Sequence, residues 1–506
     1  MRIRVAGDGE LWRGALRGLL AAIVMAGACL AQEGSLEERV LERTLDNGWR
    51  FLLLPRTDAP VVSFETYVAV GSAQDPEGMA GLAHQIQNML FKGSDRVGTR
   101  DWSAEEPALE SLDQSFQELH KARASEDPQL IAAAEARFEA ARNSAAAFVV
   151  SDEYGRLLEE AGGGPTLNAY TTADETRFVV SLPSNQIELW CWMESERFSR
   201  PVFREFYVER DALLADRRSR VENDPAGRLA EALLLTAYGD HPLARPTIGS
   251  EDEIRSFTRP AALKFFHRYY VPANMRTAIV GDFDPAEMLS LIERYFGGLP
   301  TRRAPAYPAL AAIEQEAQRS VMVPFDAQPR LMLAFHAPAI THPDAAAVEV
   351  AVRLLGYARS SRLERRLLRE EALASEVAVS PAWRGDRNAS LAMIRAVPIQ
   401  GVSLARLEAA ILEEIASLAS TGPDAEELAG VKRVASADHL RSLRDNGAIA
   451  AGLAAYDAKA GGWLHFFQTA KRLQAVSSED VQRVLGTWFS ASHRTLATLQ
   501  PTEEDR

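Results

Sequence analysis

The sequence has almost no cysteine and no long apolar run beyond its first 31 residues. Cys29 lies in that N-terminal segment, which leaves Cys191 alone and excludes an intramolecular disulfide in the rest of the chain. Cys191 lies in an apolar helical stretch without a nearby histidine or basic cluster, so we expect a buried, unreactive thiol. No later stretch approaches the roughly 20 apolar residues of a membrane-spanning helix, so the mature chain is expected to be soluble.

An excess of positive charge is also missing. The formal net charge is −14, from 56 Lys and Arg against 70 Asp and Glu. Nucleic acids and anionic membranes bind basic patches, so this balance argues against either as a partner. Hydrophobic residues make up 47% of the 506 residues, which is enough for a large core. At about 100–200 residues per domain, two or three domains are expected.

Residues 1–31 are typical of a secretory signal peptide. Arginines precede the apolar stretch 19–28, and small residues follow up to Ala31. We predict cleavage after Ala31 and a periplasmic location if the source is Gram-negative. We prefer this to lipoprotein anchoring at Cys29, because Ala26 is a poor residue three positions before such a cysteine.

The segment 103–150 differs from its surroundings. It is rich in Ala, Glu, Gln and Arg, and apolar residues recur on one helical face. These residues are Leu109, Leu112, Phe116 and Leu119. Pro128 then begins a second helix. We predict an inserted helical hairpin, a solvated strut with one buried stripe. Before it, residues 50–55 and 61–70 are apolar and β-branched, which predicts two strands.

The chain contains an internal repeat on either side of a Pro-rich linker, residues 300–318. Residues 257–270 align without a gap with residues 476–489, an offset of 219 (489 less 270). Each segment has a hydroxyl residue suited to cap a helix, ends in paired aromatics, and is followed by Arg-Thr and a strand. The sequence therefore predicts an α+β fold with two homologous domains, 40–299 and 319–506, related by duplication. Each should be a mainly antiparallel sheet packed with helices.

The segment His84-Gln85-Ile86-Gln87-Asn88 resembles a damaged metal motif. Residues at i and i+4 share one helix face, so two histidines there can bind one zinc ion. A glutamate beside them can take a proton from metal-bound water, and the inverted order of this motif is His-x-x-Glu-His. Only the first of these three chemical positions is retained here.

The surroundings of this segment resemble the pitrilysin/insulinase family of metallopeptidases. Its motif lies within Gly-x-x-His-x-x-Glu-His-Met-x-Phe-Lys-Gly-Thr, and this chain has Gly81, His84 and Met-Leu-Phe-Lys-Gly at 89–93. Further matches are Gly162-Gly163, Asn168-Ala169, Glu209-Arg210, 222–225, 241–242, 248–249, 269–274, 281–285 and 361–367. The resemblance covers residues 44–300 well and 320–500 more loosely. It implies two repeated domains with a peptide-binding chamber between such halves, and an insert like that of a bacterial branch.

The resemblance also shows where this chain departs from the family. The general base falls on Gln87 and the second zinc histidine on Asn88, and a neutral amide replaces neither. The third ligand, a Glu seven residues after Glu209, falls on Asp216. A second-domain Tyr that acts near the scissile carbonyl falls on Ser375. We therefore predict no intact catalytic site and no cofactor, with zinc only if an unusual ligand set binds it.

Asn168 and Ala169 match the edge strand that receives an extended substrate in this family, a backbone contact that needs no metal. We predict a non-catalytic subunit that binds extended peptides and pairs with an active homologue, as a heterodimer, or with itself. One alternative is an active zinc metalloendopeptidase that uses an unusual set including His84 and Asp216. Another is a peptide-binding scaffold of the cell envelope.

Overall fold

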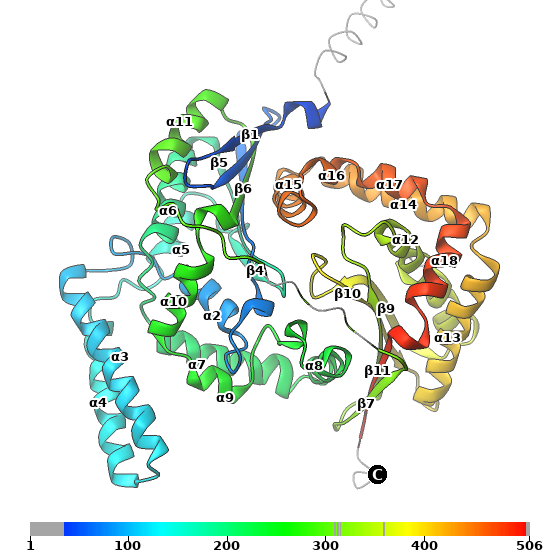
Figure 1. The fold of residues 1–506 in the computed structure, drawn as a ribbon, viewed down its shortest axis with the longest axis horizontal. Helices are drawn as coiled ribbons and strands as arrows, with labels where there is room; N and C mark the ends of the chain where they lie inside the picture. The colour runs from blue at the N-terminus through cyan, green and yellow to red at the C-terminus, as the bar shows by residue number, and fades with distance from the viewer. Residues whose placement is uncertain (1–34, 308–309, 311–312, 314, 358–359, 502–506) are drawn as a thin grey trace, which may run out of the picture.

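The computed structural model describes residues 35–501, except 308–309, 311–312, 314 and 358–359. The predicted signal peptide, with Cys29, lies outside the described residues. Two sheets with their helices lie beside each other in Figure 1. We refer to residues 35–299 as the first half and to residues 319–501 as the second half. Among the described helices, none is long and apolar enough to cross a membrane.

The first sheet has six strands in the order β1-β2-β6-β3-β5-β4. Its strands are β1 (Leu41–Thr44), β2 (Arg50–Pro55), β3 (Val61–Val68), β4 (Asn168–Thr171), β5 (Thr176–Pro183) and β6 (Met275–Gly281). β2 and β6 run parallel and the other neighbours are antiparallel. In the described part of the chain β4 pairs with β5 alone, so it forms one edge of the sheet.

The first half contains the following helices, most of which build its core. They are η1 (Leu36–Arg39), η2 (Ser72–Gln74), α2 (Leu82–Met89), α3 (Trp102–Ala124), α4 (Pro128–Ala146), α5 (Glu153–Glu160), η3 (Ser184–Gln186), α6 (Ile187–Ser199), α7 (Phe206–Arg217), η4 (Arg218–Glu222), α8 (Pro225–Tyr238), η5 (Pro242–Ala244), α9 (Glu251–Ser256), α10 (Arg259–Tyr269), η6 (Pro272–Asn274) and α11 (Pro285–Phe296). Cys191, on α6, is buried and unpaired as expected, and burial raises the pKa of its thiol.

The second sheet repeats the first. Its order is β7-β11-β8-β10-β9, with β7 and β11 parallel and the other neighbours antiparallel. The strands are β7 (Arg319–Pro324), β8 (Arg330–Ala337), β9 (Ala374–Trp383), β10 (Ser390–Pro398) and β11 (Arg494–Gln500). In chain order and in neighbours these five strands correspond to β2, β3, β4, β5 and β6. The predicted α+β fold with two duplicated halves is confirmed.

The helices of the second half follow the same plan. They are α12 (Ala345–Gly356), η7 (Glu364–Glu370), α13 (Leu404–Thr421), α14 (Ala425–Ser442), α15 (Asn446–Ala460), α16 (Leu464–Phe467), α17 (Thr469–Ala475), α18 (Ser478–Trp488) and η8 (Ala491–His493). α10 and α18 are related by the predicted offset of 219 residues, and the side chains of Thr258 and Ser477 cap them. β6 and β11 keep this offset, which pairs Met275 with Arg494. The two Arg-Thr pairs noted in the sequence are therefore not structurally equivalent, because Arg276 lies one residue later in its strand than Arg494 does.

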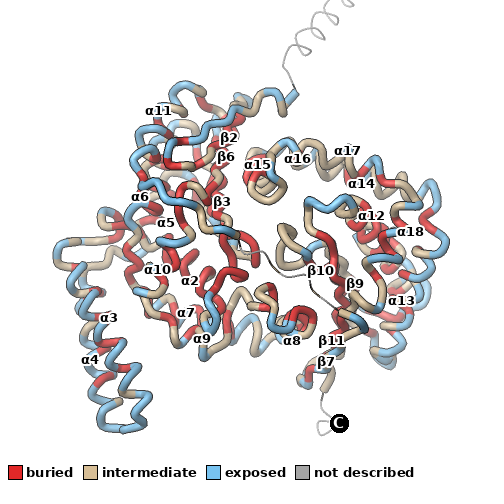
Figure 2. Tube along the Cα trace, in the orientation of Figure 1, coloured by how far each residue is buried: buried red, intermediate tan, exposed pale blue. Residues whose placement is uncertain are grey.

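Each half contributes one helix to the sheet of the other (Figure 1). α8, from the first half, packs through Leu229 and Leu233 against Met332 and Leu499 of the second sheet. α15, from the second half, packs against β3 and β6 of the first sheet. Figure 2 shows buried residues on both helices where the halves meet. Since α8 and α15 hold equivalent places in the duplicated order, the exchange is reciprocal.

The predicted insert forms the antiparallel helices α3 and α4, which project from the first half in Figure 1. The stripe predicted on α3 is buried, and Phe116 packs against Phe138 of α4 with ring centroids 5.6 Å apart. Tyr207 of α7 stacks on Phe116 at 4.4 Å, and Asp113 accepts hydrogen bonds from Arg259 and Tyr207. These contacts attach the base of the hairpin to the first half.

Candidate functional site

Helix α2 is held at its first turn by a buried carboxylate. The first backbone N–H groups of a helix have no partner within it, so they need acceptors from elsewhere. Asp75 accepts hydrogen bonds from the N–H groups of Gly81 and Ala83, each at 2.8 Å. Gly81 has φ 92°, a left-handed conformation that suits glycine, and a Cβ there would lie 2.5 Å from the backbone nitrogen of Gly249. This contact sets the direction in which α2 leaves the sheet.

A cavity of about 460 Å³ lies between α2, β4 and α7. It is lined by His84, Gln87, Asn88, Asn168, Ala169, Tyr170, Ala212, Leu213, Asp216 and Arg220. The structure thus brings together six of the seven residues singled out from the sequence. The seventh, Ser375, does not line the cavity. It is exposed on β9, where its hydroxyl donates to the carbonyl of Val397 at 3.3 Å.

Arg220 engages the carboxylate at the third ligand position. Its guanidinium lies 2.6 Å from the carboxylate of Asp216, one helical turn earlier. Burial of the ring lowers the pKa of His84 and is the largest cause. Asp216 raises this pKa in part, and the nearby guanidinium of Arg220 lowers it further. The Nδ1 atom of His84 is buried without a hydrogen-bond partner among the described residues. His84 is therefore a neutral imidazole at neutral pH.

Gln87 joins α2 to the edge strand. Its Oε1 atom accepts a hydrogen bond from the hydroxyl of Thr171 on β4 at 2.7 Å, and its Nε2 atom donates to Asn88 at 3.4 Å. The side chain is buried. A carboxamide has no basic site near neutral pH, so Gln87 cannot serve as a general base. Its hydrogen bond contributes to the wall of the cavity.

The cavity does not fit a catalytic zinc ion, which the resemblance would imply. Such sites use three protein ligands drawn from His, Cys, Asp and Glu. Here one histidine and one aspartate face the cavity, the aspartate is paired with a guanidinium, and the position of the second histidine holds the amide of Asn88. Across the described residues, no group of three or more such side chains could hold a metal.

β4 offers the cavity an open sheet edge. Asn168 and Tyr170 are exposed on it, and the amide of Asn168 donates to the hydroxyl of Tyr170 at 3.0 Å. A strand with one unpaired side can receive an extended peptide through backbone hydrogen bonds. The free edge of β4 therefore lies beside the cavity, where an extended backbone can pair with it.

Arg220 and Tyr170 line the cavity but were not singled out from the sequence. Arg220 lies four residues after Asp216, the spacing at which opposite charges pair on a helix, and that spacing was the available signal. Tyr170 lies two residues after Asn168, on the same face of the strand.

Comparison with known proteins places two regions of the chain in one group. Residues 146–251 match the model of insulinase, peptidase family M16. Residues 256–434 match the model of the peptidase M16 inactive domain. Together these regions span more than half of the chain.

Whole-length relatives agree with these matches. Zinc protease PqqE of Helicobacter pylori is 23% identical over 466 residues, which cover 90% of this chain and 92% of that protein. The crystal structure of a protease from Helicobacter pylori has a TM-score of 0.77 at 22% identity, covering 91% of this chain and 99% of that one. The periplasmic protease PqqL from Escherichia coli has a TM-score of 0.68 at 19% identity. The match covers 92% of this chain but 48% of PqqL.

Proposed function

This chain belongs to the insulinase family of peptidases, M16, and from that premise we propose that it is a non-catalytic subunit that binds extended peptides. We propose further that it pairs with an active homologue. The observation that carries the proposal is that Asn88 and Gln87, which stand at the family's metal and base positions, line one cavity together with His84 and Asp216.

The chemistry of the cavity supports the loss of catalysis. Removal of a general base alone costs about 10²–10⁴ in rate. The carboxylate of Asp216 is also paired with Arg220, so a metal would have to displace a guanidinium to reach it. Asn88 supplies an amide, which is a poor zinc donor. Three separate requirements of hydrolysis are thus unmet at one site.

The retained cavity walls support peptide binding. β4 keeps a free edge beside the cavity, and Thr171 holds Gln87 so that the floor of the cavity is closed next to this edge. Pairing with such an edge uses hydrogen bonds of the peptide backbone and depends little on the side chains of the peptide. The proposed ligands are therefore extended peptides of varied sequence.

The proposed setting is the periplasm. Residues 1–31 have the features of an export signal, and the related PqqL of known structure is described as a periplasmic protease. A binding subunit with no hydrolytic centre would act there beside a homologue that retains His-x-x-Glu-His.

Metal analysis and peptidase assays, on the purified chain alone and with its co-expressed homologue, test the proposal. We expect no stoichiometric zinc, no cleavage of unfolded peptides by the chain alone, and altered activity of the homologue when both are present. Stoichiometric zinc with chelator-sensitive cleavage would instead establish an active enzyme. His84 and Asp216, which share the cavity, are the residues that this alternative would use. Peptide binding without co-purification of a homologue would favour an envelope scaffold.

A further inference from the structure

A loop of the second half reaches the first half close to the cavity. Residues 384–389, between β9 and β10, form this docking loop, which begins with Arg384. The Arg384 guanidinium donates to the Thr247 hydroxyl at 2.6 Å, to the Arg245 carbonyl at 2.6 Å and to the Ser72 hydroxyl at 3.1 Å. All three acceptors belong to the first half.

The remainder of the docking loop contacts the turn after β4. Asp174, which is buried in this turn, accepts hydrogen bonds from the backbone N–H of Arg387 at 2.9 Å and from the Asn388 amide at 3.2 Å. The N–H of Ala173 donates to the carbonyl of Arg384 at 3.2 Å. A Cβ at Gly385 would lie 2.2 Å from the carboxylate of Asp174, so the approach is as close as glycine allows.

These two anchor points lie next in the chain to two elements that line the cavity, α2 and β4. Ser72 lies three residues before Asp75, whose carboxylate caps α2. Ala173 lies two residues after the end of β4. The two segments also contact each other, since the N–H of Ser72 donates to the carbonyl of Thr172 at 2.9 Å and that of Ala73 to Ala173 at 3.1 Å. The docking loop therefore lies on the seam between the segment that leads to α2 and the turn that follows β4.

We propose that Arg384 is a positioning residue of the peptide site: by docking on this seam it sets the spacing of α2 and β4, and so makes peptide binding in the first half depend on the second half. This inference rests on the proposed peptide-binding function. It adds to that function a residue that does not line the cavity and comes from the other half of the chain.

The conformation of Arg384 agrees with this role. Its φ is 82°, which is unfavourable for a residue with a side chain and persists only where surrounding contacts hold it. Arg384 is half-buried, and burial lowers its pKa to about 10, so the guanidinium is still charged at neutral pH. The planar guanidinium donates to three acceptors in fixed directions. It therefore fixes the position of the docking loop on the first half more narrowly than an apolar contact would.

The test compares Arg384→Ala and Arg384→Lys with the wild-type full-length chain. Two measurements are made at 25 °C: the affinity for a fluorescently labelled extended peptide, and hydrogen exchange at residues 81–84 and 168–173. We expect Arg384→Ala to weaken peptide binding about tenfold and to speed exchange in both segments, as for coupled sites. Arg384→Lys keeps the positive charge but loses the planar guanidinium, so its peptide affinity and exchange rates should lie between those of the wild type and Arg384→Ala. Arg395→Ala, an exposed arginine on β10, is the matched control and should change neither.

Wild-type affinity and wild-type exchange in a folded Arg384→Ala protein would overturn the inference, even if its thermal stability were lower. Should that variant not fold, Arg384→Lys and Asn388→Ala remove fewer bonds and must still shift both measurements in the same direction. If the wild-type chain binds no extended peptide, the proposed function fails. The exchange measurement then still decides whether Arg384 positions α2 and β4.

Discussion

At the scale of single residues, the proposed loss of hydrolysis rests on a few modest differences from the family motif, and these lie in the cavity at His84. Asn88 is close in size to the histidine it replaces, and Asp216 lacks one methylene of glutamate. The pairing of Asp216 with Arg220 adds a cation where a zinc ion would bring its own charge. These positions all line the one cavity beside β4.

Reversal of these replacements should restore a metal site. The variant Gln87→Glu, Asn88→His, Asp216→Glu and Arg220→Ala supplies three ligands and a base on the existing helices. We expect it to bind about one zinc per chain and the wild-type chain to bind none, as measured by elemental analysis after dialysis. The same variant with His84→Ala is the control and should lose the metal. Failure of the fourfold variant to bind zinc would show that the helices are misplaced for ligation.

His336 should make the protein sensitive to acid. It is 4% exposed on β8, beside Tyr238 of α8, with His241, His493 and Arg319 as its charged or titratable neighbours. Burial is the main cause that lowers its pKa to about 4. The unfolded chain, with a pKa near 6.5, takes up the proton first, so stability is complete above pH 6.5 and falls between pH 6.5 and 4.

The expected contribution of His336 to this loss is about 3 kcal/mol. Urea unfolding at pH 7 and pH 4.5 measures it, and His336→Leu should flatten the difference between the two values. His342→Leu is a suitable control because His342 lies on the surface. An equal pH dependence in His336→Leu and the wild type would contradict the assignment.

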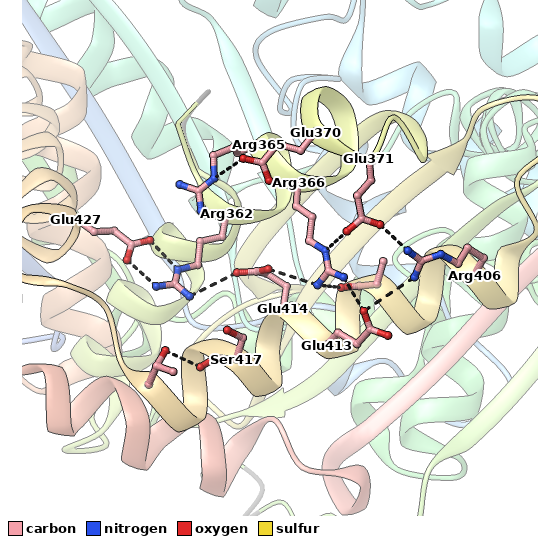
Figure 3. Close-up of polar contacts among 12 residues, drawn as sticks. Arg362, Arg365, Arg366, Glu370, Glu371, Arg406, Glu413, Glu414, Ser417 and Glu427 are labelled. Atoms are coloured by element: carbon pink, nitrogen blue, oxygen red, sulfur yellow. Dashed lines mark hydrogen bonds and ion pairs between the residues drawn. The ribbon is translucent and has the colours of Figure 1, made fainter.

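At the scale of elements, a ladder of ion pairs joins η7 to α13 and α14 (Figure 3). Arg366 of η7 contacts Glu371 at 2.6 Å, Glu413 at 2.5 Å and Glu414 at 3.5 Å. Arg362 continues the ladder to Glu414 and Glu427. η7 is a π-helical segment, a form that is rare in proteins. The ladder therefore fixes the segment that leads into β9.

Removal of Arg366 should cost more than removal of a neighbouring arginine. Arg366→Met would leave three carboxylates near one another around a side chain that is 18% exposed, and we expect a loss of about 2 kcal/mol in unfolding free energy. Arg365→Met removes one exposed contact to Glu370 and should cost at most about 0.5 kcal/mol. Chemical denaturation of both variants provides the comparison, and equal losses would show that the ladder is not cooperative.

Much of this element structure could be predicted from the sequence. The strand at 50–55 follows from a short apolar run, and the buried stripe of α3 follows from an apolar pattern of period 3.6. The capping of α10 and α18 follows from Thr258 and Ser477. The pairing of Gln87 with Thr171 could not be predicted, because it depends on the packing of α2 beside β4, two elements separated by the inserted hairpin.

At the scale of the whole molecule, the halves are joined by more than their linker. Leu233 of α8 and Leu453 of α15 are each fully buried against the opposite sheet. Lys459 of α15 adds an ion pair to Glu175 of the first half at 2.6 Å, and it also pairs with Asp386 of its own half at 2.8 Å. Helical periodicity shows that α8 and α15 have apolar faces but not which sheet they cover, so the sequence predicted the duplication without the exchange.

A cut in the linker should therefore leave the molecule assembled. We expect a chain with a protease site placed within residues 300–318 to elute as one particle after cleavage, by size-exclusion chromatography under native conditions. Leu233→Asp combined with Leu453→Asp buries a charge on each side of the contact, and the cleaved variant should separate or aggregate. Separation of the cleaved wild-type halves would show that the linker alone holds them.

The reciprocal position of α8 and α15 also bears on how such a chain could arise. In a single ancestral half, this helix would have lain away from its own sheet and left one face of that sheet uncovered. Two identical copies could have covered each other's sheets by exchanging the helix, as in domain swapping. Fusion of the two genes would then give one polypeptide with two halves that exchange a helix, a fused twin. In such a twin the fold depends on the traded helices and not on His84 or Gln87, so selection for hydrolysis can lapse while the architecture persists.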